Sequence, residues 1–110
     1  MIELVAHRFR LLGEPVRLRI LQVLEHGERT VNEIVEILEA NQSNISKHLG
    51  MLHQGGLVSR RREGNSIYYL IADPVIFRLC EIVCKSTADQ LRIQFADLSE
   101  LETRYRLRKR

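Results

Sequence analysis

The chain has 110 residues, of which 45% are hydrophobic and 28% are charged. This length and composition fit one folded domain and exclude a second. The sequence lacks the roughly 18 consecutive apolar residues of a transmembrane helix, and it lacks the apolar run and cleavage site of a signal peptide. We therefore expect a cytoplasmic protein with no membrane partner, with its single domain over residues 1–100.

The formal net charge of +3 hides an uneven distribution of charge. Five basic residues lie in the last seven positions, whereas residues 1–103 hold two more acidic than basic residues. We expect residues 101–110 to form a basic tail that can bind phosphates without sequence preference. Residues 41–69 hold four basic residues and one acidic residue, and this local excess is a candidate contact surface for phosphates.

Three short helices are predicted in the N-terminal part of the chain. Apolar residues from Ile2 onward recur at helical spacing until Gly13, and Pro15 suits the first turn of a second helix that extends to Glu25. The segment Thr30-Val31-Asn32-Glu33 matches a capping box and predicts a third helix that ends near residue 39. The apolar face of this third helix is expected at Ile34, Ile37 and Leu38.

A fourth helix is predicted from Gln42 to about Gln54, with Asn41 as its cap and a Gly-Gly pair after it. Its buried positions recur at i, i+4 and i+7 and are Ile45, Leu49 and Leu52. A break of two or three residues separates it from the third helix, so the two helices form a helix-turn-helix. The fold class predicted is thus mainly α with a small β-hairpin.

The hairpin consists of two strand candidates, Leu57–Arg62 and Ile67–Ile71, with residues 63–66 as the turn. Such a hairpin after a helix-turn-helix resembles a basic wing. Because strand side chains alternate between faces, the arginines that face a ligand depend on the pairing register, which the sequence leaves open.

The exposed face of the fourth helix is small, polar and singly basic, as is typical of side chains that contact base edges or phosphates. A face that serves only solvation usually carries several Glu and Lys side chains. The candidate DNA-binding residues are Gln42, Ser43, Asn44, Ser46, Lys47, His48, Arg60, Arg61, Arg62, Asn65 and Ser66. Two alternatives are that His48 is a packing residue and that the three arginines are a solvated strand edge.

A long terminal helix is predicted after Asp73-Pro74, which suit the N-cap and first helical positions. It has one apolar stripe for a helix-helix seam and a second, with Ile76, Leu79 and Val83, that can pack on the body. Together with the first helix, it offers more apolar surface than one domain can cover, so we expect a homodimer. The interface residues expected are Val5, Phe9, Phe77, Cys84, Ala88, Leu91, Phe95 and Leu98.

Two cysteines, Cys80 and Cys84, lie four positions apart on the seam. One hypothesis is a thiol site that binds a soft metal or metalloid inducer such as arsenite, cadmium or Cu(I), with a third ligand from the partner subunit, or that is oxidised. The other is that both are small buried residues that only pack. A disulfide within one helix at this spacing would be strained, so a secretory framework is excluded.

Several motifs resemble the ArsR/SmtB family of bacterial winged-helix repressors. They are residues 11–21 (LLGEPVRLRIL), 42–49 (QSNISKHL), 55–58 (GGLV) and 64–69 (GNSIYY). The resemblance covers about residues 6–98. It implies a dimer whose recognition helices enter successive major grooves of a palindromic double-stranded operator, and repression that an inducer releases.

The residues that bind metal in members of that family are not present at the corresponding positions of this chain. Members with a metal site on the third helix have a Cys-Val-Cys type of motif, whereas this chain has Thr30, Asn32 and Val35 in that region. Members with a zinc site between their last helices use His, Asp and Glu, but this chain has no histidine after His53. We expect no certain cofactor, and Cys80 and Cys84 are the remaining candidates for an effector.

No nucleophile-base pair, carboxylate dyad or Gly-rich phosphate loop is present, so we do not expect an enzyme. The function predicted is a homodimeric, DNA-binding transcriptional repressor. One alternative is a winged-helix module that binds proteins, since a fold does not fix a function. Another is a small thiol redox or metal-buffering protein, which would leave the polar helix face and the basic hairpin unexplained.

Overall fold

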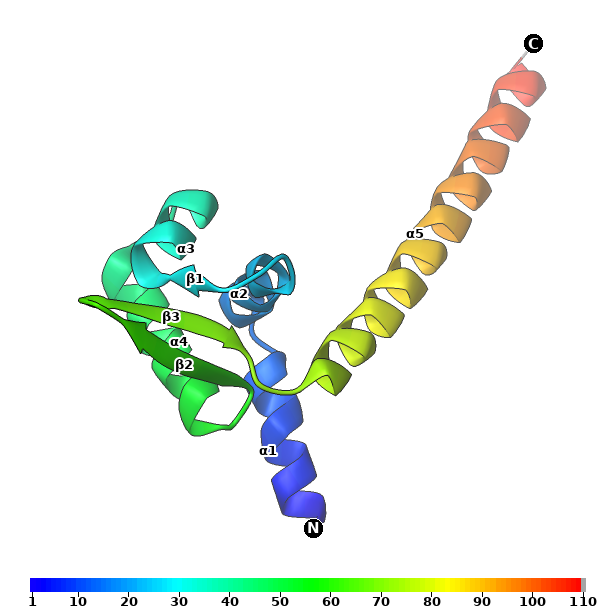
Figure 1. The fold of residues 1–110 in the computed structure, drawn as a ribbon. Helices are drawn as coiled ribbons and strands as arrows, with labels where there is room; N and C mark the ends of the chain where they lie inside the picture. The colour runs from blue at the N-terminus through cyan, green and yellow to red at the C-terminus, as the bar shows by residue number, and fades with distance from the viewer. Residues whose placement is uncertain (110) are drawn as a thin grey trace. The chain divides into compact units, whose positions relative to one another are not determined.

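The computed structural model describes the backbone of residues 1–109 and the side chains of residues 1–96. Figure 1 shows the order of elements. They are α1 (Ile2–Leu12), α2 (Pro15–Glu25), β1 (Arg29–Thr30), α3 (Val31–Leu38), α4 (Gln42–Gln54), β2 (Val58–Glu63), β3 (Ser66–Ile71) and α5 (Pro74–Lys109). The chain divides into two compact units, Met1–Phe77 and the part that begins at Arg78.

Side-chain caps fix where the helices of the first unit begin. The Thr30 and Glu33 side chains each accept a hydrogen bond from the other residue's backbone N–H, which confirms the predicted capping box. Asn41 Oδ1 accepts from the N–H of Asn44 at 3.2 Å, as predicted. Glu14 was not predicted as a cap, yet its Oε2 accepts from the N–H of Arg17 at 3.1 Å. These acceptors satisfy backbone donors that lack a partner within the helix.

The core of the first unit lies where α4 packs against α2, α3 and β2. The predicted stripe of α4 is fully buried, because Ile45, Leu49 and Leu52 are each 0% exposed. On α3 the prediction was right for Ile34, which is 0% exposed, and wrong for Ile37, which is 53% exposed. An eight-residue helix that packs along one side buries a narrower face than its apolar pattern suggests.

The sheet has three antiparallel strands in the order β1-β3-β2. The two-residue strand β1 was not predicted, since so short a segment has no periodicity to detect. Glu63 pairs with Ser66 as the last rung of the hairpin, so the turn is two residues long rather than the predicted four. Gly64 has φ 61°, a left-handed conformation that glycine adopts without strain in such a turn.

The terminal helix α5 begins as predicted, with Asp73 Oδ1 accepting a hydrogen bond from the N–H of Val75 at 3.0 Å. Ile76, which belongs to the first unit, is buried there and only 5% exposed, as predicted. The backbone of residues 101–109, part of the expected tail, continues the helix. In the part of the chain that was searched, no helix is long and apolar enough to cross a membrane.

Candidate nucleic-acid interface

The outward face of α4 carries a row of short polar side chains and one lysine. Gln42, Ser43, Asn44, Ser46 and Lys47 are all exposed. The buried stripe on the opposite side of α4 fixes the rotation of the helix about its axis, so this face is held toward solvent by packing. Five of the six α4 residues proposed from the sequence are therefore available to a ligand.

His48 is the exception among the α4 residues predicted to bind DNA. It is 8% exposed, which places it on the packed side of the helix. Its Nδ1 lies 3.9 Å from Glu14 Oε2, and Arg17 Nε lies 4.0 Å from the same oxygen. Both nitrogen atoms are buried and have no hydrogen-bond partner. At these distances they face the Glu14 carboxylate, and the three side chains form a polar cluster between α4 and the start of α2. This burial favours the alternative that His48 is a packing residue over a contact with DNA.

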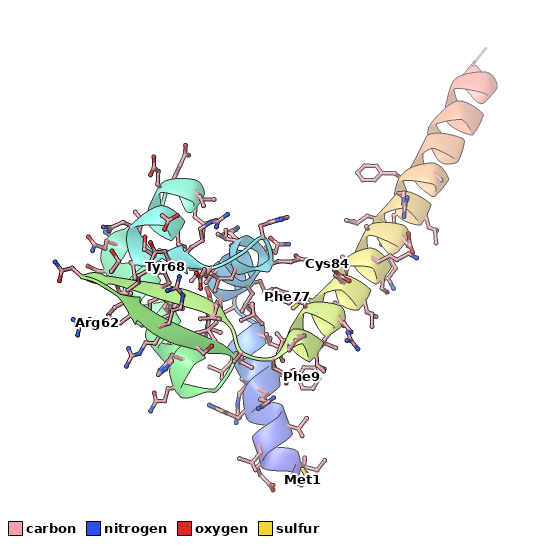
Figure 2. The ribbon with its side chains drawn as sticks, viewed as in Figure 1. Met1, Phe9, Arg62, Tyr68, Phe77 and Cys84 are labelled. Atoms are coloured by element: carbon pink, nitrogen blue, oxygen red, sulfur yellow. The ribbon has the colours of Figure 1, made fainter. Side chains whose placement is uncertain are left out.

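The register of the hairpin separates the three arginines between the two faces of the sheet. Arg60 pairs with Tyr69 and Arg62 pairs with Ile67, so both arginines lie on the face that carries the buried residues Val58 and Tyr69. Figure 2 labels Arg62, which lies near the hairpin turn. Within residues 1–96, the side chains of Arg60 and Arg62 form no ion pair and no hydrogen bond. These two exposed guanidinium groups are therefore available to phosphates.

Arg61 lies on the other face, where it binds two carboxylates. Its Nε donates to Glu28 Oε2 at 2.8 Å, a second guanidinium nitrogen donates to Glu28 Oε1, and a third donates to Glu63 Oε2 at 3.1 Å. The guanidinium carbon lies 4.7 Å from the ring centroid of Tyr68, which is the strand partner of Arg61. Of the three arginines, Arg61 alone binds other side chains among residues 1–96.

These contacts shift the pKa values of both partners. The hydrogen bond from Arg61, more than the charge itself, holds the pKa of Glu28 below its ordinary value of 4.5. The hydrogen bonds to Glu28 and then to Glu63 raise the pKa of Arg61 above its ordinary value. Both groups stay charged at neutral pH, so the pair persists over the physiological range.

The hairpin turn carries the remaining candidates, Asn65 and Ser66. Both are exposed, and Ser66 opens β3 opposite Glu63. They lie at the end of the hairpin that is furthest along the strands from the buried Val58. Their short polar side chains extend the candidate surface to the tip of the wing.

The two cysteines lie in the second unit, on α5. Neither forms a disulfide; Cys84 is exposed and Cys80 is half-buried. Figure 2 labels Cys84 on the helix. Among the described residues that were searched, no group of three or more His, Cys, Asp or Glu side chains is placed to hold a metal ion. A soft ion that takes three or more ligands would need, besides Cys80 and Cys84, a further ligand from outside this set.

Sequence reasoning missed Glu14 and Glu28 as residues that shape the site. Glu14 could have been found, because it directly precedes a proline at the start of a helix. Glu28 could not, because it contacts a residue 33 positions away and the contact depends on the register of the sheet.

Comparisons with known proteins show which family and fold the chain resembles. Residues 14–60 match the model of the family described as "Bacterial regulatory protein, arsR family". The chain is 37% identical over 100 residues to the uncharacterized HTH-type transcriptional regulator Rv0081 of Mycobacterium tuberculosis, covering 90% of this chain and 88% of that protein. The crystal structure of Rv0081 superposes with a TM-score of 0.76 and 36% identity, covering 84% of this chain and 94% of that one.

Two further relatives are informative. The solution structure of a homodimeric winged helix-turn-helix DNA-binding domain from Mycobacterium bovis, described as a possible ArsR-family regulator, superposes with a TM-score of 0.75. It is 37% identical, and the match covers 82% of this chain and 83% of that one. A probable mercury resistance operon repressor of Streptomyces lividans is 39% identical over 84 residues, which cover 76% of this chain and 67% of that protein.

Proposed function

The chain belongs to the arsR family of bacterial regulatory proteins, and we propose that two copies bind a palindromic operator through α4 and the hairpin. It is a DNA-binding transcriptional regulator and not an enzyme. In a helix-turn-helix protein the recognition helix lies in the major groove, and the half-sites of a dimer are about one helical turn of DNA apart.

The exposed face of α4 carries this proposal. It presents Gln42, Ser43, Asn44 and Ser46 in its first half, the part of a recognition helix that contacts base edges. The amide side chains of Gln and Asn can form hydrogen bonds with adenine, and serine hydroxyls can do so with several bases. Lys47 can bind a phosphate. The face holds no carboxylate that would repel DNA.

The hairpin supplies phosphate contacts beside the recognition helix. Arg60 and Arg62 share one face and are exposed, so they can follow the DNA backbone together, with Asn65 and Ser66 at the tip. The basic tail over residues 101–110 adds a charge that attracts DNA of any sequence.

The dimer interface is proposed on α1 and α5. Both helices expose large apolar side chains, among them Val5 at 42%, Phe9 at 56%, Leu91 at 49% and Phe95 at 66%. Water-exposed apolar surface of this kind favours association with a second copy. Phe77, Cys84 and Ala88 belong to the same proposed interface, and Leu98, also proposed, lies outside the described side chains.

DNA titrations at several salt concentrations test the operator proposal. Lys47→Ala, Arg60→Gln and Arg62→Gln should each weaken binding to promoter DNA and lower the slope of log K against log salt by about two, because each removes one phosphate contact from each of the two copies. The control is Lys85→Ala, which removes an exposed charge on α5 outside the proposed surface. Normal affinity and slope in all three variants would refute the assignment.

We further propose that a thiol-directed inducer acts at Cys80 and Cys84. The exposure of Cys84 and the similarity to a probable mercury resistance operon repressor support this proposal. Two thiolates four positions apart on a helix can bind one soft ion or be oxidised. Arsenite, cadmium or a peroxide should release the wild-type protein from its operator. A Cys80→Ser, Cys84→Ser variant that responds equally would leave the cysteines as packing residues.

A further inference from the structure

One side chain connects all three strands of the sheet. In the register, Thr30 of β1 and Arg61 of β2 both pair with Tyr68 of β3, so the three residues form one row across the sheet. The Arg61 side chain extends over the Tyr68 ring and reaches Glu28, which directly precedes β1. Two parallel hydrogen bonds join the guanidinium to the two oxygens of Glu28.

The charge of Arg61 is already compensated within the protein. Glu28 and Glu63 both bind its guanidinium, so the cluster of these three residues has a formal charge of −1. A phosphate that approached Arg61 would meet two carboxylates. The free basic side chains, Arg60 and Arg62, lie on the opposite face of the hairpin. The location and the charge of Arg61 therefore both argue against a direct contact with DNA.

The hairpin needs an attachment of this kind to keep a fixed orientation. A two-stranded hairpin is marginally stable by itself, and β1 supplies only two residues of pairing to β3. Glu28 lies in the segment between α2 and β1, and β1 leads directly into the helix-turn-helix. A bond from β2 to Glu28 thus joins the hairpin to the part of the chain that leads into α3 and α4.

We propose that Arg61 and Glu28 form a wing brace, a pair that positions the hairpin so that Arg60 and Arg62 meet the DNA backbone while α4 lies in the major groove. Arg61 is a positioning residue in this proposal and makes no phosphate contact. The inference rests on the proposed operator binding, which it deepens by dividing the three arginines between two roles.

The brace and a direct phosphate contact predict opposite effects of Glu28→Gln. If Glu28 braces the wing, its neutral variant loses the charged pair, and operator affinity should fall about two- to fivefold with an unchanged salt slope, the range that exposed ion pairs permit. If Glu28 only shields a DNA-binding Arg61, the same variant should bind more tightly and with a steeper slope. Arg61→Gln should likewise lower affinity without lowering the slope.

The experiment measures operator affinity against salt for the wild type, Glu28→Gln, Arg61→Gln and the double variant. Glu36→Gln is the matched control, because it makes the same charge change at an exposed position of α3 that has no ion pair among residues 1–96. The double variant should bind no worse than either single variant, and the exchanged pair Glu28→Arg, Arg61→Glu should regain part of the affinity. Amide hydrogen exchange in β2 and β3 should rise in the single variants and not in Glu36→Gln.

The outcomes separate the two proposals. A wild-type protein that does not bind promoter DNA specifically overturns the operator proposal itself. If the wild type binds specifically but Glu28→Gln binds the operator at least as tightly as Glu36→Gln does, the wing brace is overturned and the operator proposal stands. A lower salt slope in Arg61→Gln, of the size found for Arg60→Gln, would also overturn it, since Arg61 would then be a phosphate contact.

Discussion

Neighbouring residues of one strand have different roles in this molecule because the pleat of the sheet sends them to opposite faces. Arg60 and Arg62 share a face, and Arg61, between them in sequence, binds Glu28 instead. A run of three arginines therefore counts as two potential DNA contacts and one residue that is held by internal ion pairs. His48 and Lys47 differ in the same way, because Lys47 is exposed whereas the next residue, His48, is buried against α2.

The Glu28–Arg61 pair should make a pH-dependent contribution to stability. The pKa of Glu28 is lowered in the folded protein from an ordinary value of 4.5, so the folded state holds its proton less tightly than the unfolded state. The contribution of the pair to the free energy of unfolding is complete above pH 4.5, and it is lost as the pH falls through the lower pKa that Glu28 has in the folded state. Urea unfolding should find Glu28→Gln less stable than wild type at pH 7 and nearly equal to it at the acid end of the titration. A difference that grows on acidification would contradict this.

Removal of the Glu14 side chain should destabilise the first unit. Glu14→Ala deletes the N-cap acceptor of α2, which is worth about 0.5–2 kcal/mol, and leaves Arg17 and His48 without the carboxylate that they face. Chemical denaturation measures the loss. Glu25→Ala, at the exposed opposite end of the same helix, is the control and should change the free energy of unfolding by less than about 0.5 kcal/mol. Equal effects of the two substitutions would show that Glu14 is not a cap in solution.

Among the helices and strands, the sequence predicts those features that depend on residues close together in the chain. The capping box at Thr30, the cap at Asn41 and the bounds of α4 follow from residues within one helical turn of each other. The strand β1 and the pairing of Arg61 with Glu28 depend on contacts between distant segments, so no local pattern indicates them. The sequence thus proposed which residues belong to the candidate DNA-binding surface. Which of the three arginines share a face of the sheet could be known only from the pairing register of the strands.

Two glycines at α4 should respond in opposite ways to substitution by alanine. A Cβ at Gly50 would meet nothing within 4 Å, so Gly50→Ala should raise stability by about 0.5–1 kcal/mol through better helix propensity. A Cβ at Gly55 would overlap Leu11 Cδ1, and Leu11 is 5% exposed, so Gly55→Ala should cost about 1–3 kcal/mol. Thermal unfolding distinguishes the two. If Gly55→Ala were also stabilising, α1 would not pack closely on the end of α4.

Association of two copies would decide whether the proposed DNA-binding surface can act. The second unit exposes Ile82, Val83, Leu91 and Phe95, and on its own this long helix buries little of its apolar surface. A second copy would cover such side chains and would also set the spacing between the two recognition helices. The proposed interface therefore links stability to operator binding.

A charge in the proposed seam should separate the subunits. Phe95→Glu removes an aromatic contact from both copies and adds two buried charges, so the dissociation constant of the dimer should rise about 30-fold or more. Ala96→Glu makes the same charge change at the next position, which is also exposed but lies outside the predicted apolar stripe. Sedimentation equilibrium measures both, and equal effects would place the interface elsewhere.

The exposed apolar surface of α5 has a consequence for how sharply such a regulator responds to its own abundance. When chains are scarce, the number of dimers grows with the square of the chain concentration. Halving the supply of chains would then cut the active species about fourfold. A cell could switch the regulated genes through a modest change in synthesis or degradation of the regulator, even with no inducer present.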